Sequence, residues 1–380
     1  MKILRKIILL MMTFILMLST SNSAFVTVSA ESKHEDMDDL DKLLIAHKYM
    51  SSETDIDLWK GIDSLREIIN LYDLDDNVIA YYISFSPKGY AIVNNNLDNP
   101  IAIEFGDGKN HSIDKLVKSS EYKAGESHIV YAGPGYSFIK EEVISGNSLE
   151  EKEAIKQKLK LDKLYAQLNT KNEKEIKLHQ ESRTIVKEKN HNLVGGSGSI
   201  YNDISWDTMP SGSYISGYIP FGGTTWAVMS DYDSIASNHC GATAATNISL
   251  YYANRGYTNL KKNNSVYDTF VDLHNRIGNG PVMMIAPDVK SYASSRGYTM
   301  TSSDVGTYSA LKTATSNGRP CGILVTGGIT EWHWVVSTGW REYTSGGKYI
   351  RVVTGWENSA NNFYLWGDPT VWSMTEYYIQ

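Results

Sequence analysis

One cysteine of this sequence lies in a setting suited to nucleophilic catalysis. Cys240 precedes a run of small and then larger residues that continues without proline to Tyr252, and Gly256 follows as a stop signal. This pattern predicts a buried helix with Cys240 in its first turn, where the helix dipole and unpaired backbone amides favour the thiolate. A lone buried cysteine is more commonly a small apolar residue, as we predict for Cys321 within its apolar strand. Catalysis by Cys240 therefore requires a base.

Four histidines in the second half of the chain are candidates for that base. His191 lies in a flexible segment, the side chain of His239 should diverge from that of its neighbour Cys240, and His274 lies on a predicted amphipathic helix. His333 opens a predicted strand just after a Gly-Gly turn, with apolar residues behind it. A histidine at the mouth of a strand can face a helix N-terminus, as a Cys–His pair requires.

A third group could orient the histidine. Two strands, 332–343 and 348–356, flank a turn centred near residue 345, and pairing about that centre brings residues 356–358 beside His333. Asn358 or Glu357 could accept the imidazole N–H and select its tautomer. Either residue could instead only cap the turn.

The motifs around Cys240 and His333 resemble those of the papain-like cysteine peptidases. Cys-Gly-x-Thr-Ala-Ala-Thr-Asn is followed about 90 residues later by His-Trp-Val-Val-x-x-Gly-Trp. Within residues 200–380 the resemblance is closest to the bacteriocin-processing, double-glycine-leader branch, and more distant to staphopain and streptopain. It implies a papain-like α+β fold, in which the helix bearing Cys240 packs on an antiparallel sheet bearing His333.

The sequence departs from the family pattern at two positions. Ala242 stands where the family usually has proline. Ser234 stands where papain-like enzymes place a glutamine that donates to the oxyanion, and no glutamine occurs between Gln180 and Gln380. Asn238 is the nearest amide side chain, so it could donate to the oxyanion, or it could cap the helix.

The rest of the second half predicts helices followed by strands. Apolar periodicity predicts helices over 240–254, 266–277 and 308–315. Alternating and apolar runs predict strands over 321–328, 332–340, 348–356 and 361–367. This order is typical of an α+β fold.

The first half has a different composition. Residues 1–190 hold 25 of the 36 Lys and Arg and 30 of the 43 Asp and Glu, whereas eight of the nine tryptophans follow residue 200. Helical spacing through Leu43–Ile45 and again through Leu58–Ile69 predicts helices, residues 78–105 predict three strands, and 149–189 predict a charged helix or helix pair.

The first residues resemble an export signal. Three basic residues precede an apolar run, Ile7 to Leu18, and Val28-Ser29-Ala30 suits signal-peptidase cleavage. The run is short for a bilayer span, which needs roughly 20 residues. We therefore expect a secreted, extracellular protein without a stable membrane anchor.

These features divide the chain into a signal peptide (1–30), an α+β pro-region (31–190), a linker (191–199) and a catalytic domain (200–380). The pro-region assignment rests on GYAIVNNNLDNPIAIEFG, which is similar to strand pairs in streptopain-type propeptides. An unrelated accessory domain is the alternative. A pro-region over the cleft would act as the enzyme's own inhibitor until export.

The leading hypothesis is a secreted cysteine endopeptidase, made as a zymogen, that acts on protein or peptide substrates. We expect no cofactor and no metal, because two cysteines cannot form a cysteine-rich zinc site, and no nucleic-acid partner, because the net charge is −7. One alternative is a peptidoglycan amidase or endopeptidase that uses the same Cys–His pair. The other is a non-catalytic surface-binding protein, rich in aromatic residues and poor in charge.

Overall fold

A computed structural model describes residues 37–109, 111–143, 149–189, 204–280, 282–325, 333–367 and 371–380. The predicted signal peptide and linker, and with them His191, lie outside these residues. We call residues 37–189 the N-terminal region and residues 204–380 the C-terminal region. From Asp36 onward the chain forms one compact unit. Among the helices of the described residues, none has the length and apolar character to cross a membrane.

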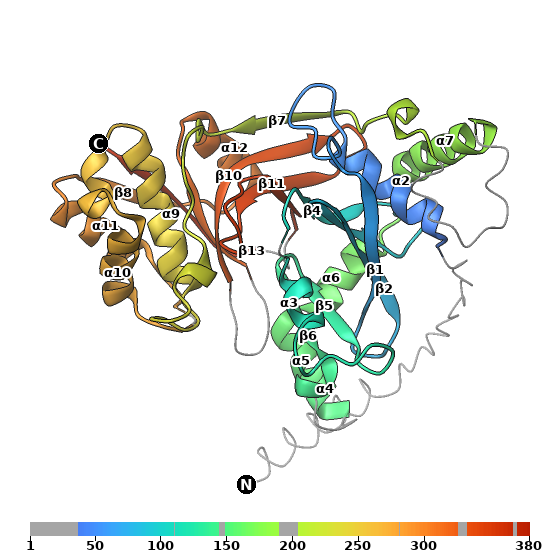
Figure 1. The fold of residues 1–380 in the computed structure, drawn as a ribbon, viewed down its shortest axis with the longest axis horizontal. Helices are drawn as coiled ribbons and strands as arrows, with labels where there is room; N and C mark the ends of the chain where they lie inside the picture. The colour runs from blue at the N-terminus through green and yellow to red at the C-terminus, as the bar shows by residue number, and fades with distance from the viewer. Residues whose placement is uncertain are drawn as a thin grey trace, which may run out of the picture. The chain divides into compact units, whose positions relative to one another are not determined.

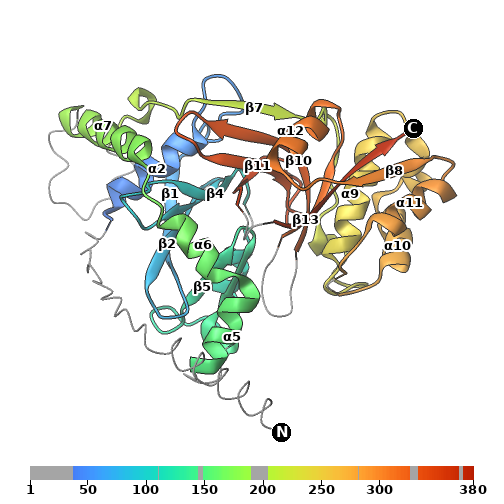
Figure 2. The same cartoon turned by 180° about the vertical axis from the view of Figure 1, so that it is seen from behind.

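Strands of both regions join in one sheet (Figures 1 and 2). The order of the strands is β6-β5-β1-β2-β3-β4-β12-β11-β10-β9-β13-β8, and β7 pairs with β10. The neighbours are antiparallel except β1 and β5, which are parallel. The two regions meet where β4 pairs with β12. The predicted α+β class is confirmed.

The N-terminal strands confirm one sequence prediction and correct another. The strands predicted over 78–105 are present, but helical spacing through Leu58–Ile69 gave a wrong prediction, because Ser64 opens a strand. In that strand Ile68 pairs with Ile83, and the ladder with β2 overrides the local periodicity. The strands are β1 (Ser64–Tyr72), β2 (Val78–Ser86), β3 (Tyr90–Asn94), β4 (Ala102–Gly106), β5 (Ile129–Gly133) and β6 (Tyr136–Ile139).

The N-terminal helices include the one predicted around Leu43. The charged stretch 149–189, predicted as one helix or a helix pair, forms three helices. Asp38 caps α2 by accepting a hydrogen bond from the Asp41 amide. Ion pairs hold α7 beside α2, among them Arg183 Nη2 to Asp38 Oδ2 at 2.6 Å. The helices are α2 (Asp39–Met50), α3 (Ser112–Val117), α4 (Lys140–Val143), α5 (Leu149–Leu159), α6 (Leu161–Leu168) and α7 (Glu173–Lys189).

The C-terminal helices match the three predictions closely. The additional helix α11 was not predicted, because its sequence, APDVKSYASS, has weak apolar periodicity. Residues 240–252 of α9 are all buried, and α10 packs beside α9 (Figure 1). The helices are α9 (Cys240–Asn254), α10 (Val266–Ile277), α11 (Ala286–Ser295) and α12 (Tyr308–Ser316).

The C-terminal strands contain the predicted meander and three strands that were not predicted, β7, β8 and β13. The hairpin turn is centred as expected, with Trp340 opposite Ile350. A register shift between Ser337 and Gly339 moves the remaining pairs by one residue. The strands are β7 (Tyr214–Tyr218), β8 (Met300–Asp304), β9 (Cys321–Val325), β10 (His333–Tyr343), β11 (Lys348–Val353), β12 (Asn362–Leu365) and β13 (Val371–Ile379).

Candidate active site

Cys240 is the first residue of α9, and it is 3% exposed. His239 occupies the N-cap position and makes no side-chain hydrogen bond to the helix start. Gly241 is needed for packing, because a Cβ at this position would lie 2.7 Å from Val282 Cγ2. The predicted placement of Cys240 in the first turn of a buried helix is confirmed, and the positive end of the helix dipole there favours a thiolate.

Asn238, the predicted side-chain oxyanion donor, precedes the N-cap residue. Its backbone is left-handed, with φ of 50°, a conformation that asparagine tolerates better than most residues. Its side chain is exposed, and its carbonyl oxygen accepts a hydrogen bond of 3.0 Å from the Gly280 amide. A backbone hydrogen bond therefore fixes the main chain at Asn238, two residues before Cys240. The role of its side chain as an oxyanion donor stays a prediction.

His333 is the first residue of β10 and is buried. Its Nε2 lies 2.7 Å from the carbonyl oxygen of Thr354. Because a carbonyl only accepts, Nε2 carries the proton, and in the neutral ring Nδ1 is left with a lone pair. The ring stacks on Trp356, with centroids 4.9 Å apart and an interplanar angle of 12°. A backbone carbonyl and an indole together fix the orientation and the tautomer of the imidazole.

The environment of His333 disfavours its charged form. Burial lowers the pKa of His333 to about 4, and the positive charge of Lys115 adds to that effect. The Thr354 carbonyl and the carboxylate of Glu104 act in the opposite direction. The imidazole is consequently neutral near pH 7 and can act as a base.

The first turn of α9 packs against the segments that carry His333 and its carbonyl partner. Trp334, the next residue after His333, would lie 3.5 Å from a Cβ placed on Gly241. Gly355, the next residue after Thr354, approaches Thr243, since a Cβ on Gly355 would lie 3.4 Å from Thr243 Cγ2. The backbones that bear Cys240 and His333 therefore meet at one place. Because side chains alternate along a strand, Trp334 is the residue of the pair that faces α9, and it belongs to the same core cluster as Cys240. The His333 side chain points to the opposite face of β10, so the two backbones meet without bringing the Cys240 and His333 side chains together.

The hairpin arithmetic located the right segment, but the residues that contact His333 differ from those expected. With the register shift, the pairing of Val336 with Val353 extrapolates to Trp356 opposite His333. Asn358, the expected orienting residue, instead accepts a hydrogen bond of 2.9 Å from the Trp226 amide through Oδ1. A backbone acceptor such as Thr354 leaves no signal in the sequence, whereas the indole of the Thr-Gly-Trp motif could have been considered.

Glu357, the other expected orienting residue, interacts with the N-terminal region. Its Oε2 accepts a hydrogen bond of 2.9 Å from the Lys109 amide. Gly108 passes so close that a Cβ there would lie 1.9 Å from Glu357 Oε1. Burial and the nearby carboxylate of Asp107 raise the pKa of Glu357. Its described contacts place it in the junction between the two regions.

The N-terminal region reaches the candidate site through α3. The ammonium group of Lys115 lies 4.3 Å from the centroid of the Trp356 ring, which stacks on His333. Burial lowers the pKa of Lys115, and Asp233 of the C-terminal region partly offsets that effect. The α3 helix thus lies against Trp356, and its charge acts on the imidazole.

The remaining cysteine and histidines have other environments. Cys321 is fully buried in β9, and burial raises the pKa of its thiol. His239 Nε2 donates to the carbonyl oxygen of Met229 at 2.9 Å, and His274 Nε2 lies 2.7 Å from Asn279 Oδ1. Among the described residues, no group of three or more His, Cys, Asp or Glu side chains could hold a metal ion.

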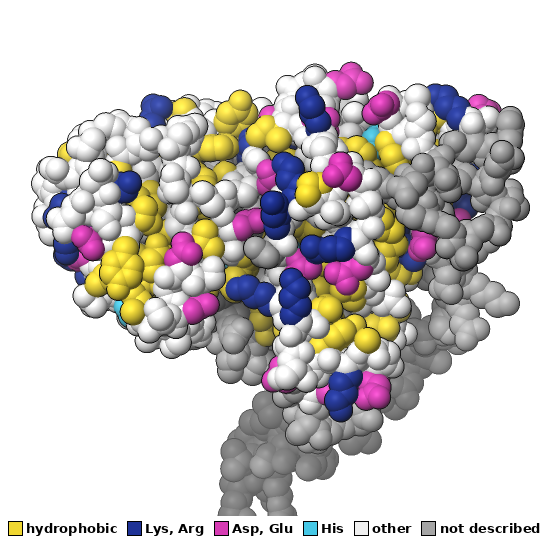
Figure 3. All heavy atoms as spheres, viewed as in Figure 1, with side chains coloured by type: hydrophobic (Ala, Val, Ile, Leu, Met, Phe, Trp, Pro, Cys, Tyr) yellow, Lys and Arg dark blue, Asp and Glu magenta, His cyan; other side chains and the backbone are white. Residues whose placement is uncertain are grey.

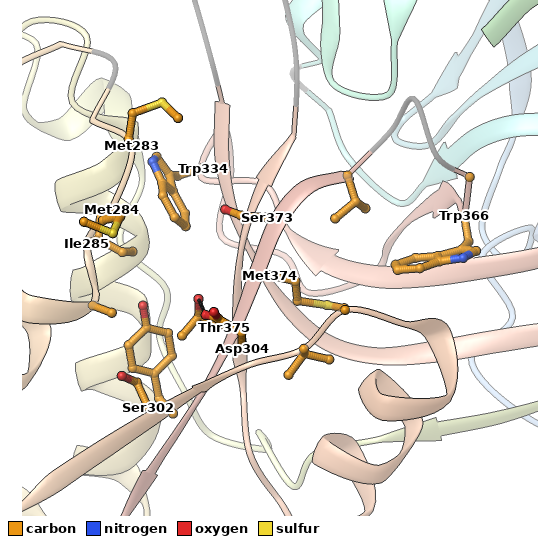
Figure 4. A pocket seen from close by; sticks show the side chains of 16 residues that line it. Met283, Met284, Ile285, Ser302, Asp304, Trp334, Trp366, Ser373, Met374 and Thr375 are labelled. Atoms are coloured by element: carbon orange, nitrogen blue, oxygen red, sulfur yellow. Dashed lines mark hydrogen bonds between the residues drawn. The ribbon is translucent and has the colours of Figure 1, made fainter. Parts of the chain in front are cut away.

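A cavity of about 600 Å³ adjoins Trp334. Figure 4 shows Trp334 together with Met283, Met284 and Ile285 beside this cavity. Strand β13 supplies Ser373, Met374 and Thr375, and Asp304 lies next to Thr375. A largely apolar hollow of this size, next to the first turn of α9, can accept a side chain of a peptide.

Neither a scan of protein-family models nor a search of curated proteins finds a match to this chain.

Proposed function

We propose that this protein is a secreted, papain-like cysteine endopeptidase made as a latent precursor. One observation carries the proposal most strongly. The helix start that bears Cys240 packs at the segments that bear His333 and Thr354, and the Thr354 carbonyl leaves Nδ1 of His333 available as a base. The predicted export signal supports the extracellular location.

The proposed reaction requires the His333 ring to turn toward α9 on activation. The Cys240 thiol then transfers its proton to Nδ1 of His333, and the sulfur attacks the carbonyl carbon of the scissile peptide bond. Backbone amides in the first turn of α9, with the Asn238 side chain as a further donor, stabilise the oxyanion. The imidazolium then protonates the leaving amine as the C–N bond breaks. Water, deprotonated by His333, hydrolyses the thioester and regenerates the thiol.

In this proposal the orienting role expected of Asn358 or Glu357 passes to Thr354 and Trp356. The Thr354 carbonyl stabilises the imidazolium by accepting a hydrogen bond from Nε2–H, as the oxygen of a side-chain amide would. Trp356 holds the plane of the ring by stacking. Substitution of Asn358 should therefore reduce activity only through the loss of its hydrogen bond to the Trp226 amide.

Latency follows from the contacts of α3. In the precursor His333 is buried, and its low pKa opposes formation of a thiolate–imidazolium pair. Movement of α3 away from Trp356 would hydrate the ring, remove the charge of Lys115 and raise the pKa of His333. The N-terminal region would thereby act as an inhibitor in cis.

Labelling by an irreversible thiol-protease inhibitor tests this function. The secreted protein should cleave a fluorescent casein, and mass spectrometry should find the inhibitor on Cys240 and not on Cys321. The Cys240→Ser variant is the matched control, since it keeps the size of the side chain and should neither react nor cleave casein. Unlabelled Cys240 in protein that cleaves casein would exclude the proposed nucleophile, and clearing of purified cell walls without casein cleavage would favour a peptidoglycan hydrolase.

A further inference from the structure

The sheet is continuous across the junction of the two regions. Strand β12 pairs with β4 through three residue pairs, among them Phe363 with Phe105. These two rings stack with centroids 5.0 Å apart and an interplanar angle of 10°. Separation of the regions would leave two unpaired strand edges, which in native proteins are covered or protected. The junction therefore has the character of a domain interior.

Two tyrosines of the C-terminal region use backbone carbonyls of the N-terminal region as their hydrogen-bond acceptors. Tyr343 Oη donates to the carbonyl of Tyr49 at 2.9 Å, and Tyr349 Oη donates to the carbonyl of Ala102 at 2.6 Å. Both tyrosines belong to a hydrophobic core made mostly of N-terminal residues. Without the N-terminal region, these rings would be exposed to water.

The N-terminal region also supplies hydrogen-bond acceptors to a buried arginine of β10. Arg341 is 0% exposed, its Nη2 donates to Asp55 Oδ2 at 3.2 Å, and its Nη1 donates to the Tyr49 carbonyl at 3.4 Å. Its guanidinium lies 4.0 Å from the centroid of the Tyr214 ring. Removal of one partner would leave the other as an uncompensated buried charge, which is strongly destabilising.

The first described residues of the C-terminal region lie across the N-terminal region. Trp206 stacks on His47, with centroids 5.4 Å apart, and its ring lies 5.2 Å from that of Trp59. Farther along, the Gly212 amide donates to the Lys48 carbonyl at 3.0 Å. A cut within 191–199 would remove none of the residues that make these contacts, because each contact joins a residue before the linker to one that follows it.

We infer that the N-terminal region is a permanent subunit and stays bound to the C-terminal region after the linker is cleaved. The interaction surface consists of β12, the buried face of β10 with Arg341, and the segment around Trp206, and its partner is this chain's own N-terminal region. Exposure of His333 then requires local displacement of α3, not loss of the whole region. The inference does not depend on whether Cys240 is a nucleophile.

A nicked protein tests the inference. A site for a specific protease, placed within residues 193–199 of the Cys240→Ala variant, allows a complete cut without self-processing. At about 1 µM and pH 7.5, size-exclusion chromatography and native mass spectrometry should show one complex of both fragments at the mass of the uncut chain. Two separated fragments, or a folded C-terminal fragment alone, would overturn the inference.

Two arginines provide a matched comparison in the nicked protein. Arg341→Met should weaken the complex on serial dilution by about 100-fold or more, the equivalent of the cost of an unpaired buried charge. Arg319 pairs with Glu376 and lies over Tyr378 within the C-terminal region, so Arg319→Met should leave dissociation unchanged. If Arg341→Met does not fold, Asp55→Asn removes the charge from the N-terminal side and should weaken the complex in the same direction. Equal dissociation of the Asp55→Asn, Arg319→Met and unsubstituted nicked proteins would contradict the assigned surface.

Discussion

The N-terminal and C-terminal regions contribute strands to one sheet but differ in the sign of their most deeply buried charges. In the N-terminal region many ion pairs lie at the surface between its own elements, such as Lys156 with Asp75 at 2.9 Å. Both regions also bury charged side chains almost completely. These are the carboxylates Glu104 and Glu175 in the N-terminal region, and Arg341 and Arg351 in the C-terminal region. Figure 3 shows Lys, Arg, Asp and Glu side chains gathered over the middle of one face, where α3 and β4 lie in Figure 1. Arg341 bonds across the junction to Asp55, and Arg351 bonds within the C-terminal region to the Ala360 carbonyl.

The same comparison explains the aromatic residues of the C-terminal region. Of the large hydrophobic side chains that are exposed among the described residues, only Tyr218 and Tyr267 are aromatic. The rings of Trp206, Tyr343 and Tyr349 instead pack with residues of the N-terminal region. An aromatic-rich composition here reflects a large shared core, so it gives little support to an aromatic binding surface.

The largest predicted effect separates the two buried cysteines of the C-terminal region. Cys240→Ala should lower kcat/KM of the activated enzyme by at least about 10⁴-fold, because no other group can form the thioester. Cys321→Ala should retain activity and lose about 1 kcal/mol of stability, since it removes only a buried sulfur from β9. Casein cleavage and urea unfolding measure the two outcomes. Full activity of Cys240→Ala would end the assignment of the nucleophile.

The next largest effect distinguishes His333, which lies at the junction of the two regions, from His274, which is remote from that junction. His333→Ala should lower kcat/KM by about 10³-fold and slow alkylation of Cys240 by iodoacetamide, because the base is lost. His274→Ala should change neither rate, since His274 contacts Asn279 at the end of α10. Casein cleavage measures kcat/KM, and mass spectrometry of samples quenched at successive times measures the alkylation rate of Cys240. Equal alkylation rates in wild type and His333→Ala would count against the pairing.

A third prediction concerns stability against pH at the junction. Burial lowers the pKa of His47 to about 4 from its usual 6.5, so folding favours the neutral ring. The contribution of His47 to the free energy of unfolding is fully present above about pH 6.5. It decreases as the pH falls toward 4, and at pH 5 about 2 kcal/mol has been lost. In His47→Phe the loss of stability between pH 7.5 and pH 5, measured by urea unfolding, should be smaller by that amount. An unchanged loss would show that His47 is not the titrating group.

The smallest predicted effect tests the contact of α3 with the candidate site. Lys115→Ala removes the ammonium that lies over Trp356 and should raise the residual activity of the uncut precursor about 2- to 5-fold, the equivalent of one partly exposed cation–π contact. Lys118→Ala, at the end of the same helix, is the control and should leave activity unchanged. The residual activity of both uncut variants is measured on a small peptide substrate. The same rise in both variants would indicate a general loosening of α3.

Local patterns in the sequence determined much of the C-terminal region. Small residues after Cys240 and the absence of proline defined α9, and the Gly-rich turn near residue 345 centred the hairpin that carries His333. These features act over a few residues, so they can be recognised without the fold. The same kind of pattern failed for Leu58–Ile69, where pairing with β2 decided the conformation.

The tertiary structure alone decided what surrounds His333 and how the regions are joined. A one-residue register shift brought Trp356 and the Thr354 carbonyl to the imidazole and left Asn358 and Glu357 to other partners. A backbone carbonyl has the same chemistry at every position, so the sequence cannot mark it as an acceptor. The pairing of β4 with β12 and the burial of Arg341 against Asp55 likewise join residues more than 200 positions apart. Such contacts depend on the packing of the whole sheet, which short-range patterns do not encode.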